Sequence, residues 1–563
     1  MRKRRGKRWL SLVLSVAMMA SLGACGGTGG MDETADDVGA GAQENTVGET
    51  AGGNDSGTMR TVSILCKESP TAGLYMENIE ENIWWQELVA DLAERNIELD
   101  LEVIQADQYP TTLQTRFSSG QELPDMVVLG RDAAEGVDDA TALRWGKQGL
   151  LLDLNEVLGE HGGDEALAFL DEYAPYVEKR VTTNDGKMYW LPNLTLKTYN
   201  GEPASNYLAV NIRKDWLEAV GMDIPTTTEE FYEAVKAFRE EDVNGSGVAD
   251  EIVSVDPTNW DNGIAQWFGL GQALVSYITT TDEVVSPWYQ DGCKEYFQYL
   301  NKMYNDGLLD SQLFGGNTDL ETQLIVENKV SSTFSWILEG WLEPQVTGTE
   351  NAYYYPIMAL QNDAGTTPLY ECEEPEKSYG KWAVTKDCDD LEAVAELFNY
   401  LYSTEYEELQ TWGGEGVSYD TSNGYKAFIG KYADGSEIPD SERLLNDYIG
   451  TTLFPRIKMV DIQSEFVTSD EAKAEIEIDT IGATPNVAHM INNYQVLPDE
   501  EQTETINGIM SDLETYADEL AVGLVIGTKS LDDWDTYMAD LKELGLDELI
   551  EINRNLCDKY NAE

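Results

Sequence analysis

The chain has 563 residues, a formal net charge of −67 and 42% hydrophobic residues. A chain of this length is too long for one hydrophobic core and suits two lobes or domains. The negative charge repels phosphate backbones, so it excludes nucleic acid as a partner, and it also argues against strongly anionic ligands.

The first residues predict an exported lipoprotein. Six basic residues among positions 2–8 precede an apolar run from Trp9 to Met19, which is too short to span a bilayer and is typical of an export signal. The run ends in Leu22-Gly23-Ala24-Cys25, which resembles the bacterial lipobox, where the cysteine sulfur accepts a diacylglycerol. We therefore expect a signal peptide at 1–24 and a lipid anchor at Cys25, with palmitate among its acyl chains. The alternative is an ordinary secreted protein with a chance cysteine at this place.

A flexible tether is predicted after the lipidated cysteine. Residues 26–59 are mostly Gly, Ala, Thr, Ser, Asn, Asp and Glu, with no aromatic residue and little apolar surface to bury. Such a segment cannot offset the entropy lost on ordering, so we assign 25–59 to the lipid-bearing cysteine and its tether. This layout places the protein on the outer face of the cell membrane, held there by its lipid alone.

The first part of the body predicts an α/β domain. Strands are expected at Thr61–Cys66, Ile97–Ile104 and Val127–Leu129, with amphipathic helices between them at Trp84–Arg95 and Gln108–Ser118. Strands and helices in alternation are typical of an α/β lobe. A comparable alternation returns after Tyr207, and helical patterns dominate from about Leu391 to the C-terminus.

The cysteines and histidines do not predict catalysis. Five cysteines remain besides Cys25, an odd number without a CxxC pair, so neither a disulfide framework nor a zinc site is indicated. They are Cys66, Cys293, Cys372, Cys388 and Cys557. The two histidines, His161 and His489, are not accompanied by a G-x-S-x-G nucleophile elbow. We therefore expect no catalytic residue and assign both histidines to structural or surface positions.

A series of short segments, in order along the chain, resembles family 1 extracellular solute-binding proteins. The Ser-Ser-Gly-Gln-Glu-Leu-Pro-Asp-Met string at 118–126 is similar to a segment of that family, and further matches follow. They are Gly149–Leu154, Asp185–Pro192, Ile212–Leu217, Pro225–Phe231, Met303–Leu309, Gly414–Tyr419, Trp534–Tyr537 and Leu541–Glu551. Their order and spacing resemble the large lipoprotein branch that serves sugar importers in Gram-positive bacteria.

The resemblance implies a fold and a function. The fold is α/β, the type II periplasmic-binding-protein fold, in which two α/β lobes are joined by hinge strands. Matching landmarks assign lobe 1 to 60–205 plus 345–404 and lobe 2 to 206–344 plus 405–563. The implied function is substrate capture for an ABC importer. A monomer without enzymatic activity would bind a carbohydrate, expected to be an oligosaccharide, between the lobes and deliver it to the permease subunits.

Two other functions stay open at this point. A peptide-binding or sensor-partner protein of the same fold would carry the same landmarks. A secreted glycoside hydrolase would also be acidic and rich in aromatic residues, and with 104 Asp and Glu a pair of carboxylates proves nothing. The 14 Trp and 29 Tyr leave rings available for stacking on pyranose faces.

One acidic segment predicts a structural calcium site. In Asp242–Glu251 oxygen-bearing side chains recur at alternate positions and glycines allow tight turns, as in loops that wrap Ca²⁺. The segment is similar to the calcium loop of alginate-oligosaccharide-binding relatives, and the alternative is an acidic turn without metal. The predicted ligands are Asp242, Asn244, Ser246, Val248 (through its carbonyl), Asp250 and Glu251.

Candidates for the ligand site come from strand ends and from the resemblance. Glu68 follows the first strand, and Arg131 and Asp132 follow the Val127–Leu129 strand, where open α/β sheets place ligand contacts. The resemblance to maltose-binding relatives adds Trp336 as an aromatic platform. The further candidates near the later lobe crossings are Trp382, Trp412, Glu415 and Tyr419.

Overall fold

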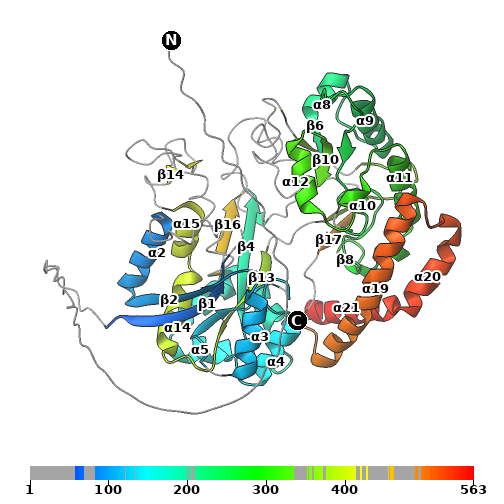
Figure 1. The fold of residues 1–563 in the computed structure, drawn as a ribbon. Helices are drawn as coiled ribbons and strands as arrows, with labels where there is room; N and C mark the ends of the chain where they lie inside the picture. Colours follow the sequence, from blue (N-terminus) through cyan, green and yellow to red (C-terminus); the bar gives the residue numbers. More distant parts are fainter. Residues whose placement is uncertain are drawn as a thin grey trace, which may run out of the picture. The chain divides into compact units, whose positions relative to one another are not determined.

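The computed structural model of the chain gives the course of most of its body (Figure 1). It describes residues 58–68, 83–120, 122–131, 133–199, 202–203, 210–260, 262–334, 352, 354–357, 360–371, 376–413, 419–420, 427–428, 454–455, 457–461, 488–491 and 496–562. The predicted signal peptide, the lipidated Cys25 and nearly all of the tether lie outside these residues.

Seven strands form the first sheet, in the order β16-β4-β13-β3-β1-β2, with β5 paired to β4. β1 runs parallel to β2 and β3, whereas β13 is antiparallel to both β3 and β4. In chain order the strands are β1 (Arg60–Lys67), β2 (Ile97–Ile104), β3 (Met126–Val128), β4 (Leu191–Tyr199), β5 (Glu202–Pro203), β13 (Glu376–Val384) and β16 (Ile457–Asp461).

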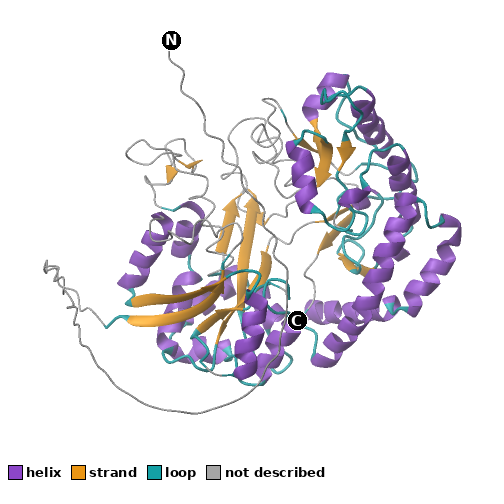
Figure 2. Ribbon diagram, viewed as in Figure 1, coloured by secondary structure: helices purple, strands orange, loops and turns teal. Residues whose placement is uncertain are grey.

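Helices flank this sheet and share one hydrophobic core with it (Figure 2). Local signals set their ends: Asp138 accepts a hydrogen bond from the Thr141 amide at the start of α4, and Gly120 adopts a left-handed conformation at the end of α3. The helices are α2 (Ile83–Glu94), α3 (Tyr109–Ser119), α4 (Asp139–Lys147), α5 (Leu154–His161), α6 (Asp164–Tyr173), α7 (Tyr176–Val181), α14 (Leu391–Leu401) and α15 (Thr404–Trp412).

Two further sheets of four strands each belong to the rest of the body. The second sheet has the order β11-β6-β10-β7 and the third has the order β12-β17-β8-β9. Their strands are β6 (Val210–Arg213), β7 (Ile252–Val253), β8 (Ser276–Ile278), β9 (Glu283–Val285), β10 (Val330–Phe334), β11 (Tyr354–Ile357), β12 (Leu369–Glu371) and β17 (Ala488–Ile491). A small ladder joins β14 (Tyr419–Asp420) to β15 (Ala427–Phe428).

A second hydrophobic core lies among the helices that accompany the second sheet. Helix α9 begins with a capping box, in which Thr227 and Glu230 each bond the other's backbone amide. The helices are α8 (Lys214–Val220), α9 (Thr228–Glu240), α10 (Ile264–Trp267), α11 (Cys293–Asn305), α12 (Thr318–Val326), α19 (Glu500–Ile526), α20 (Trp534–Glu543) and α21 (Leu546–Ala562). Single 3₁₀ turns are η2 (Pro287–Tyr289), η3 (Ser311–Leu313) and η5 (Leu531–Asp533).

The strand pairing differs from the lobe boundaries expected near 345 and 404. Tyr354–Ile357 pairs with β6 in the second sheet, although we assigned it to the lobe of the first sheet. Ile457–Asp461 pairs with β4 in the first sheet, although we assigned it to the other lobe. Helices also do not continue unbroken after Leu391, because strands β14 to β17 lie between α15 and α19. The division into two lobes therefore stays a proposal, with more crossings than the sequence indicates.

Within the part of the chain that the structure describes, no helix combines the length and the apolar character needed to cross a membrane. Cys66, Cys293, Cys388 and Cys557 are free thiols. His161 lies in the last turn of α5, and the backbone of His489 belongs to β17.

Candidate ligand-binding site

The order of the parallel strands marks one edge of the first sheet as a binding edge. β1 lies between β2 and β3 and is parallel to both, so the chain winds in opposite directions from β1. Open α/β sheets bind ligands outside the carboxyl ends of their strands at such a reversal point. The residues that follow β1, β2 and β3 are therefore the candidates.

Five side chains at this edge form what we call the strand-end cluster: Lys67, Glu68, Gln105, Arg131 and Glu135. The Gln105 side-chain amide donates to Glu68 Oε2 (2.7 Å). Glu135 accepts from Lys67 Nζ at 3.0 Å through one carboxylate oxygen and from Arg131 at 2.8 Å through the other. The Arg131 side chain is 59% exposed, so its guanidinium is accessible to a ligand from the solvent.

The loop from Leu129 to Asp138 is here called the β3–α4 loop. Hydrogen bonds from a buried lysine on β13 hold it in place. The Val137 amide donates to the Leu129 carbonyl (2.9 Å), which closes the loop on itself. Lys381 Nζ donates to the Arg131 carbonyl (2.7 Å) and to Asp139 Oδ1 (2.8 Å), and Lys381 is only 3% exposed. A loop fixed in this way loses little entropy when a ligand binds to it.

Glycine is required at one position of this loop. A Cβ atom on Gly136 would stand 2.1 Å from the Leu129 carbonyl oxygen, inside the contact distance of any two such atoms. Only a residue without a side chain lets the two ends of the loop approach so closely.

Three predicted ligand-site residues lie outside the described residues: Asp132, Trp336 and Glu415. Tyr419 begins the short strand β14, and only its backbone is described. Glu68 and Arg131 lie at the predicted strand ends, on neighbouring strands.

Trp382 and Trp412 are core residues, which corrects their assignment to the ligand site. Trp382 lies in β13 opposite Val128 and Leu191 and is 1% exposed. Trp412 ends α15 and is also buried. A ring covered on both faces offers no surface on which a sugar could stack, so we withdraw both as platform candidates.

The predicted calcium loop connects α9 to β7 and folds back on itself. Gly245 and Gly247 adopt left-handed conformations, which turn the chain tightly. The Gly247 amide donates to both carboxylate oxygens of Asp242 (3.2 and 3.0 Å). The Ser246 hydroxyl lies 2.9 Å from Asp250 Oδ1, 2.9 Å from the Val248 carbonyl and 3.4 Å from Asp242 Oδ1. The oxygens of Asp242, Val248 and Asp250 therefore converge on the Ser246 hydroxyl, which brings four of the six predicted ligands together.

The two acids at the end of this loop have opposite pKa shifts. Burial raises the pKa of Glu251, whose carboxylate accepts from the Asn244 and Asp250 amides. Burial also acts on Asp250, but hydrogen bonds from Asn244 and Ser246 and the Lys329 ammonium outweigh it and lower the Asp250 pKa. Across the described residues, no three His, Cys, Asp or Glu side chains are grouped closely enough to hold a metal ion by themselves. The oxygen-only donor set is nevertheless the chemistry that Ca²⁺ prefers.

Sequence reasoning missed four residues at the ligand-binding edge of the first sheet. They are Lys67, Gln105 and Glu135 of the strand-end cluster, and Lys381, which supports the β3–α4 loop. Lys67 and Gln105 are strand-end neighbours of residues that were found, so the same argument could have included them. Lys381 carried a weaker signal, a lysine directly before a buried run in a strand, which is unusual for an unpaired charge.

Two sequence relatives of this chain are carbohydrate-binding proteins. The chain is 22% identical to the fructooligosaccharide ABC transporter substrate-binding protein FusA of Streptococcus pneumoniae over 537 residues, which cover 90% of each chain. It is 22% identical over 420 residues to the polygalacturonan/rhamnogalacturonan-binding protein YtcQ of Bacillus subtilis, covering 74% of this chain and 75% of YtcQ.

Solved structures of relatives share the fold. FusA in complex with kestose superimposes with a TM-score of 0.66 at 20% identity, covering 89% of this chain and all of FusA. An EF-hand mutant of FusA has also been solved with fructo-nystose, with the same TM-score. The alginate-binding protein AlgQ2 without calcium ion superimposes with a TM-score of 0.62 at 20% identity, covering 89% of this chain and 98% of AlgQ2. The predicted α/β solute-binding fold is confirmed.

The family assignment rests on the sequence itself. The family model of the bacterial extracellular solute-binding protein matches residues 78–408, which is more than half of the chain and includes β2, β3 and β13 of the first sheet. The relatives are binding proteins and not enzymes, which confirms the prediction of a binder. The chain belongs to the family of bacterial extracellular solute-binding proteins.

Proposed function

We propose that this protein captures an oligosaccharide for an ABC importer. The observation that carries the proposal is the strand-end cluster, which gathers an exposed arginine, two carboxylates and an amide at the reversal point of the first sheet. Membership of the solute-binding family, the fructooligosaccharide named for FusA and the polysaccharides named for YtcQ support a carbohydrate as the ligand.

The chemistry of the cluster suits sugar hydroxyls. Each hydroxyl can donate and accept, so Glu68 would accept from a hydroxyl while Arg131 donates to a neighbouring one. Charge-assisted hydrogen bonds of this kind are stronger than those between neutral groups. The net charge of −67 favours a neutral ligand over an acidic one. We retain Trp336 as the aromatic platform and Asp132, Glu415 and Tyr419 as further contacts.

We also propose that the 242–251 loop holds Ca²⁺ in a structural role. Asp242, Asn244, Ser246, the Val248 carbonyl, Asp250 and Glu251 would supply the oxygens. The bound ion would supply positive charge that holds the converging carboxylates together, and the loop would then fix the connection from α9 to β7. Two relatives support this proposal, because the solved structures include an EF-hand mutant of FusA and AlgQ2 without calcium ion.

The cellular setting is part of the proposal. Cys25 would carry the lipid, the tether to residue 59 would keep the body clear of the membrane surface, and the body would act as a monomer that meets the permease subunits. The membership in an extracellular family agrees with this location.

A binding screen tests the proposed function. Full-length protein is screened by thermal shift against neutral oligosaccharides, acidic oligosaccharides and peptides, and hits are measured by calorimetry. We expect a neutral oligosaccharide to raise the melting temperature and to be recovered unchanged after incubation. Glu68→Ala should weaken its binding, whereas Glu156→Ala, at an exposed position on α5, should not. Binding of peptides alone would overturn the ligand class, and shortened sugar products would favour the hydrolase.

A further inference from the structure

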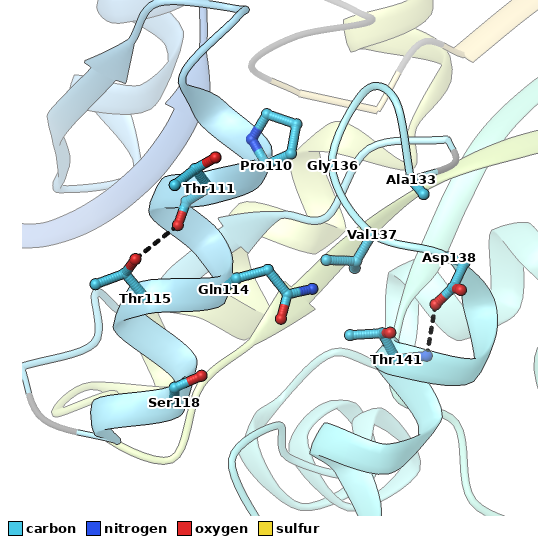
Figure 3. Close-up of a pocket in the computed structure, with 10 residues that line it drawn as sticks. All are labelled: Pro110, Thr111, Gln114, Thr115, Ser118, Ala133, Gly136, Val137, Asp138 and Thr141. Atoms are coloured by element: carbon cyan, nitrogen blue, oxygen red, sulfur yellow. Dashed lines mark hydrogen bonds between the residues drawn. The ribbon is translucent and has the colours of Figure 1, made fainter.

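A hollow of about 590 Å³ lies between α3 and the β3–α4 loop (Figure 3). Its volume is within the range of about 300–1,000 Å³ that is usual for small-molecule sites. One wall is the exposed face of α3, and the other is formed by the loop and the first turn of α4. The lining residues are Pro110, Thr111, Gln114, Thr115, Ser118, Ala133, Gly136, Val137, Asp138 and Thr141.

The lining is rich in hydroxyl and amide groups and nearly free of charge. Asp138 is its only charged residue, and one of its carboxylate oxygens already accepts from the Thr141 amide (2.8 Å; Figure 3). Thr115 donates its hydroxyl to the Thr111 carbonyl (2.8 Å), which leaves the oxygen free to accept. Among the described residues, the side chains of Gln114 and Ser118 have no hydrogen-bond partner.

The remaining lining is apolar. Pro110 presents C–H groups on the α3 wall, Val137 lies almost wholly buried beneath the loop wall, and in Figure 3 the Gln114 side chain reaches from α3 toward Val137. A sugar unit has the same mixture, with hydroxyls around its rim and C–H groups on its faces. An anionic ligand would find no opposite charge here, because the lining contains no basic residue.

Two segments of the chain connect the hollow to the strand-end cluster. Helix α3 starts five residues after the end of β2, so Pro110 lies near the carboxyl edge of the sheet. The hydroxyl of the adjacent Tyr109 fixes this end, because it is bonded to the Leu65 and Val128 carbonyls (2.9 and 2.5 Å). The β3–α4 loop then borders both places: its start carries Arg131, and its later part, from Ala133 to Asp138, lines the hollow.

We infer that this hollow is a second carbohydrate subsite, which holds the distal units of an oligosaccharide whose first units lie at the strand-end cluster. The inference rests on the proposed function and extends it, because it makes the preferred ligand a chain of several neutral sugar units. The loop wall is already fixed by Lys381 and by the Gly136 approach to Leu129, so this side of the subsite requires little rearrangement.

The test compares ligands of increasing length. Full-length wild-type protein is titrated with two neutral series, fructooligosaccharides and galactooligosaccharides, each from disaccharide to pentasaccharide. We expect the Kd to fall by about tenfold or more along the series that binds, which corresponds to about 1.4 kcal/mol. Thr115→Trp should fill the hollow and Gln114→Leu should remove its amide, so both should reduce the gain with length to less than about threefold.

Ala90→Trp is the matched control, because it adds the same ring to an exposed position on α2 outside the hollow. It should keep the full gain with length. A wild-type Kd that does not change with length overturns the subsite and leaves the proposed function standing. A gain that survives in both Thr115→Trp and Gln114→Leu also overturns the subsite. Failure of the wild-type protein to bind any oligosaccharide overturns the proposed function together with the subsite.

Discussion

Lys381 Nζ lies 2.7 Å from the main-chain carbonyl oxygen of Arg131, although 250 positions separate the two residues in the sequence. The same ammonium group also bonds Asp139 at the start of α4. One buried charge on β13 therefore fixes both ends of the segment that carries Arg131. We regard Lys381 as a positioning residue for the ligand-binding edge.

Lys381→Met should weaken ligand binding. The change keeps an unbranched side chain that is one atom shorter but leaves the Arg131 carbonyl and Asp139 without their donor, so the β3–α4 loop should loosen. We expect the Kd for the oligosaccharide found in the screen to rise by about tenfold, or about 1.4 kcal/mol. The free energy of unfolding should fall by about 1–3 kcal/mol. Calorimetry measures the first quantity and urea denaturation the second.

Lys386→Met is the control for this change. Lys386 pairs with the adjacent Asp387 at an accessible position, and its ammonium makes no bond to the β3–α4 loop. It should leave the Kd unchanged. A Lys381→Met protein that loses stability but keeps the wild-type Kd would show that Lys381 is structural only.

Calcium removal should lower the stability of the protein. An ion that binds only the folded state stabilises it by mass action, by about 2.7 kcal/mol at a concentration one hundred times the Kd. Adding a chelator to calcium-loaded protein should therefore lower the melting temperature. Asp250→Ala should abolish the difference, while Asp223→Ala, at an exposed position outside the loop, should preserve it. Equal melting of the wild-type protein with and without chelator would refute the site.

Alkaline pH should destabilise the fold through Cys66. Burial, reinforced by the nearby Glu102 carboxylate, raises the pKa of the Cys66 thiol to about 12. The thiol of an unfolded chain ionises near pH 8.5, so unfolding releases a proton at pH values between the two pKa values. The contribution of Cys66 is complete below about pH 8.5 and is lost as the pH rises toward 12, with a limiting slope of about 1.4 kcal/mol per pH unit.

Urea denaturation at several pH values measures this effect. The free energy of unfolding of Cys66→Ala should fall less steeply above pH 9 than that of the wild-type protein. The other alkaline groups contribute equally to both curves, so the difference belongs to Cys66. Parallel curves would contradict the assignment.

Two tryptophans should respond differently to removal. Trp382→Ala should lower the free energy of unfolding by about 3–5 kcal/mol, because it opens a cavity in the first core. Trp336→Ala should instead raise the Kd for the oligosaccharide by about 5- to 150-fold, the equivalent of losing about 1–3 kcal/mol of ring stacking. Denaturation and calorimetry on both proteins separate the two effects. An unchanged Kd in a folded Trp336→Ala protein would remove Trp336 from the site.

Cys25→Ser should abolish lipidation. The serine hydroxyl cannot replace the thiol as the acceptor of the diacylglycerol, so the protein should be released into the medium or stay unprocessed. Metabolic labelling with palmitate and cell fractionation measure this outcome. Wild-type acylation of the mutant would show that the anchor lies elsewhere.

The local pattern of the sequence predicts the first βαβαβ segment closely. The strand expected at Ile97–Ile104 is β2 residue for residue, and the helix expected at Trp84–Arg95 differs from α2 by one residue at each end. Periodicity is sufficient there because each element packs against its neighbours in sequence. It is not sufficient for β11 and β16, because the choice of sheet depends on partners far along the chain, which no local pattern encodes.

The residues of the candidate site also differ in whether a local sequence pattern can predict them. Glu68 and Arg131 follow from the rule that strand ends bind ligands, and that rule needs only the predicted strands. The sequence alone does not show whether Trp382 is a core residue or a binding residue, since a tryptophan in a strand is equally suited to packing in a core and to stacking on a sugar. The role of Lys381 depends on β13 lying beside β3, a pairing that only the folded chain reveals.

The first sheet has a consequence for the biogenesis of the protein. Its strands are drawn from four distant stretches, and β16 is not available until the chain has emerged beyond residue 457. Contacts of such large sequence separation slow folding. The N-terminal part therefore cannot complete its sheet until most of the chain has been synthesised. A separately expressed fragment ending near residue 205 would lack β13 and β16 and would expose the edges of β3 and β4 to aggregation.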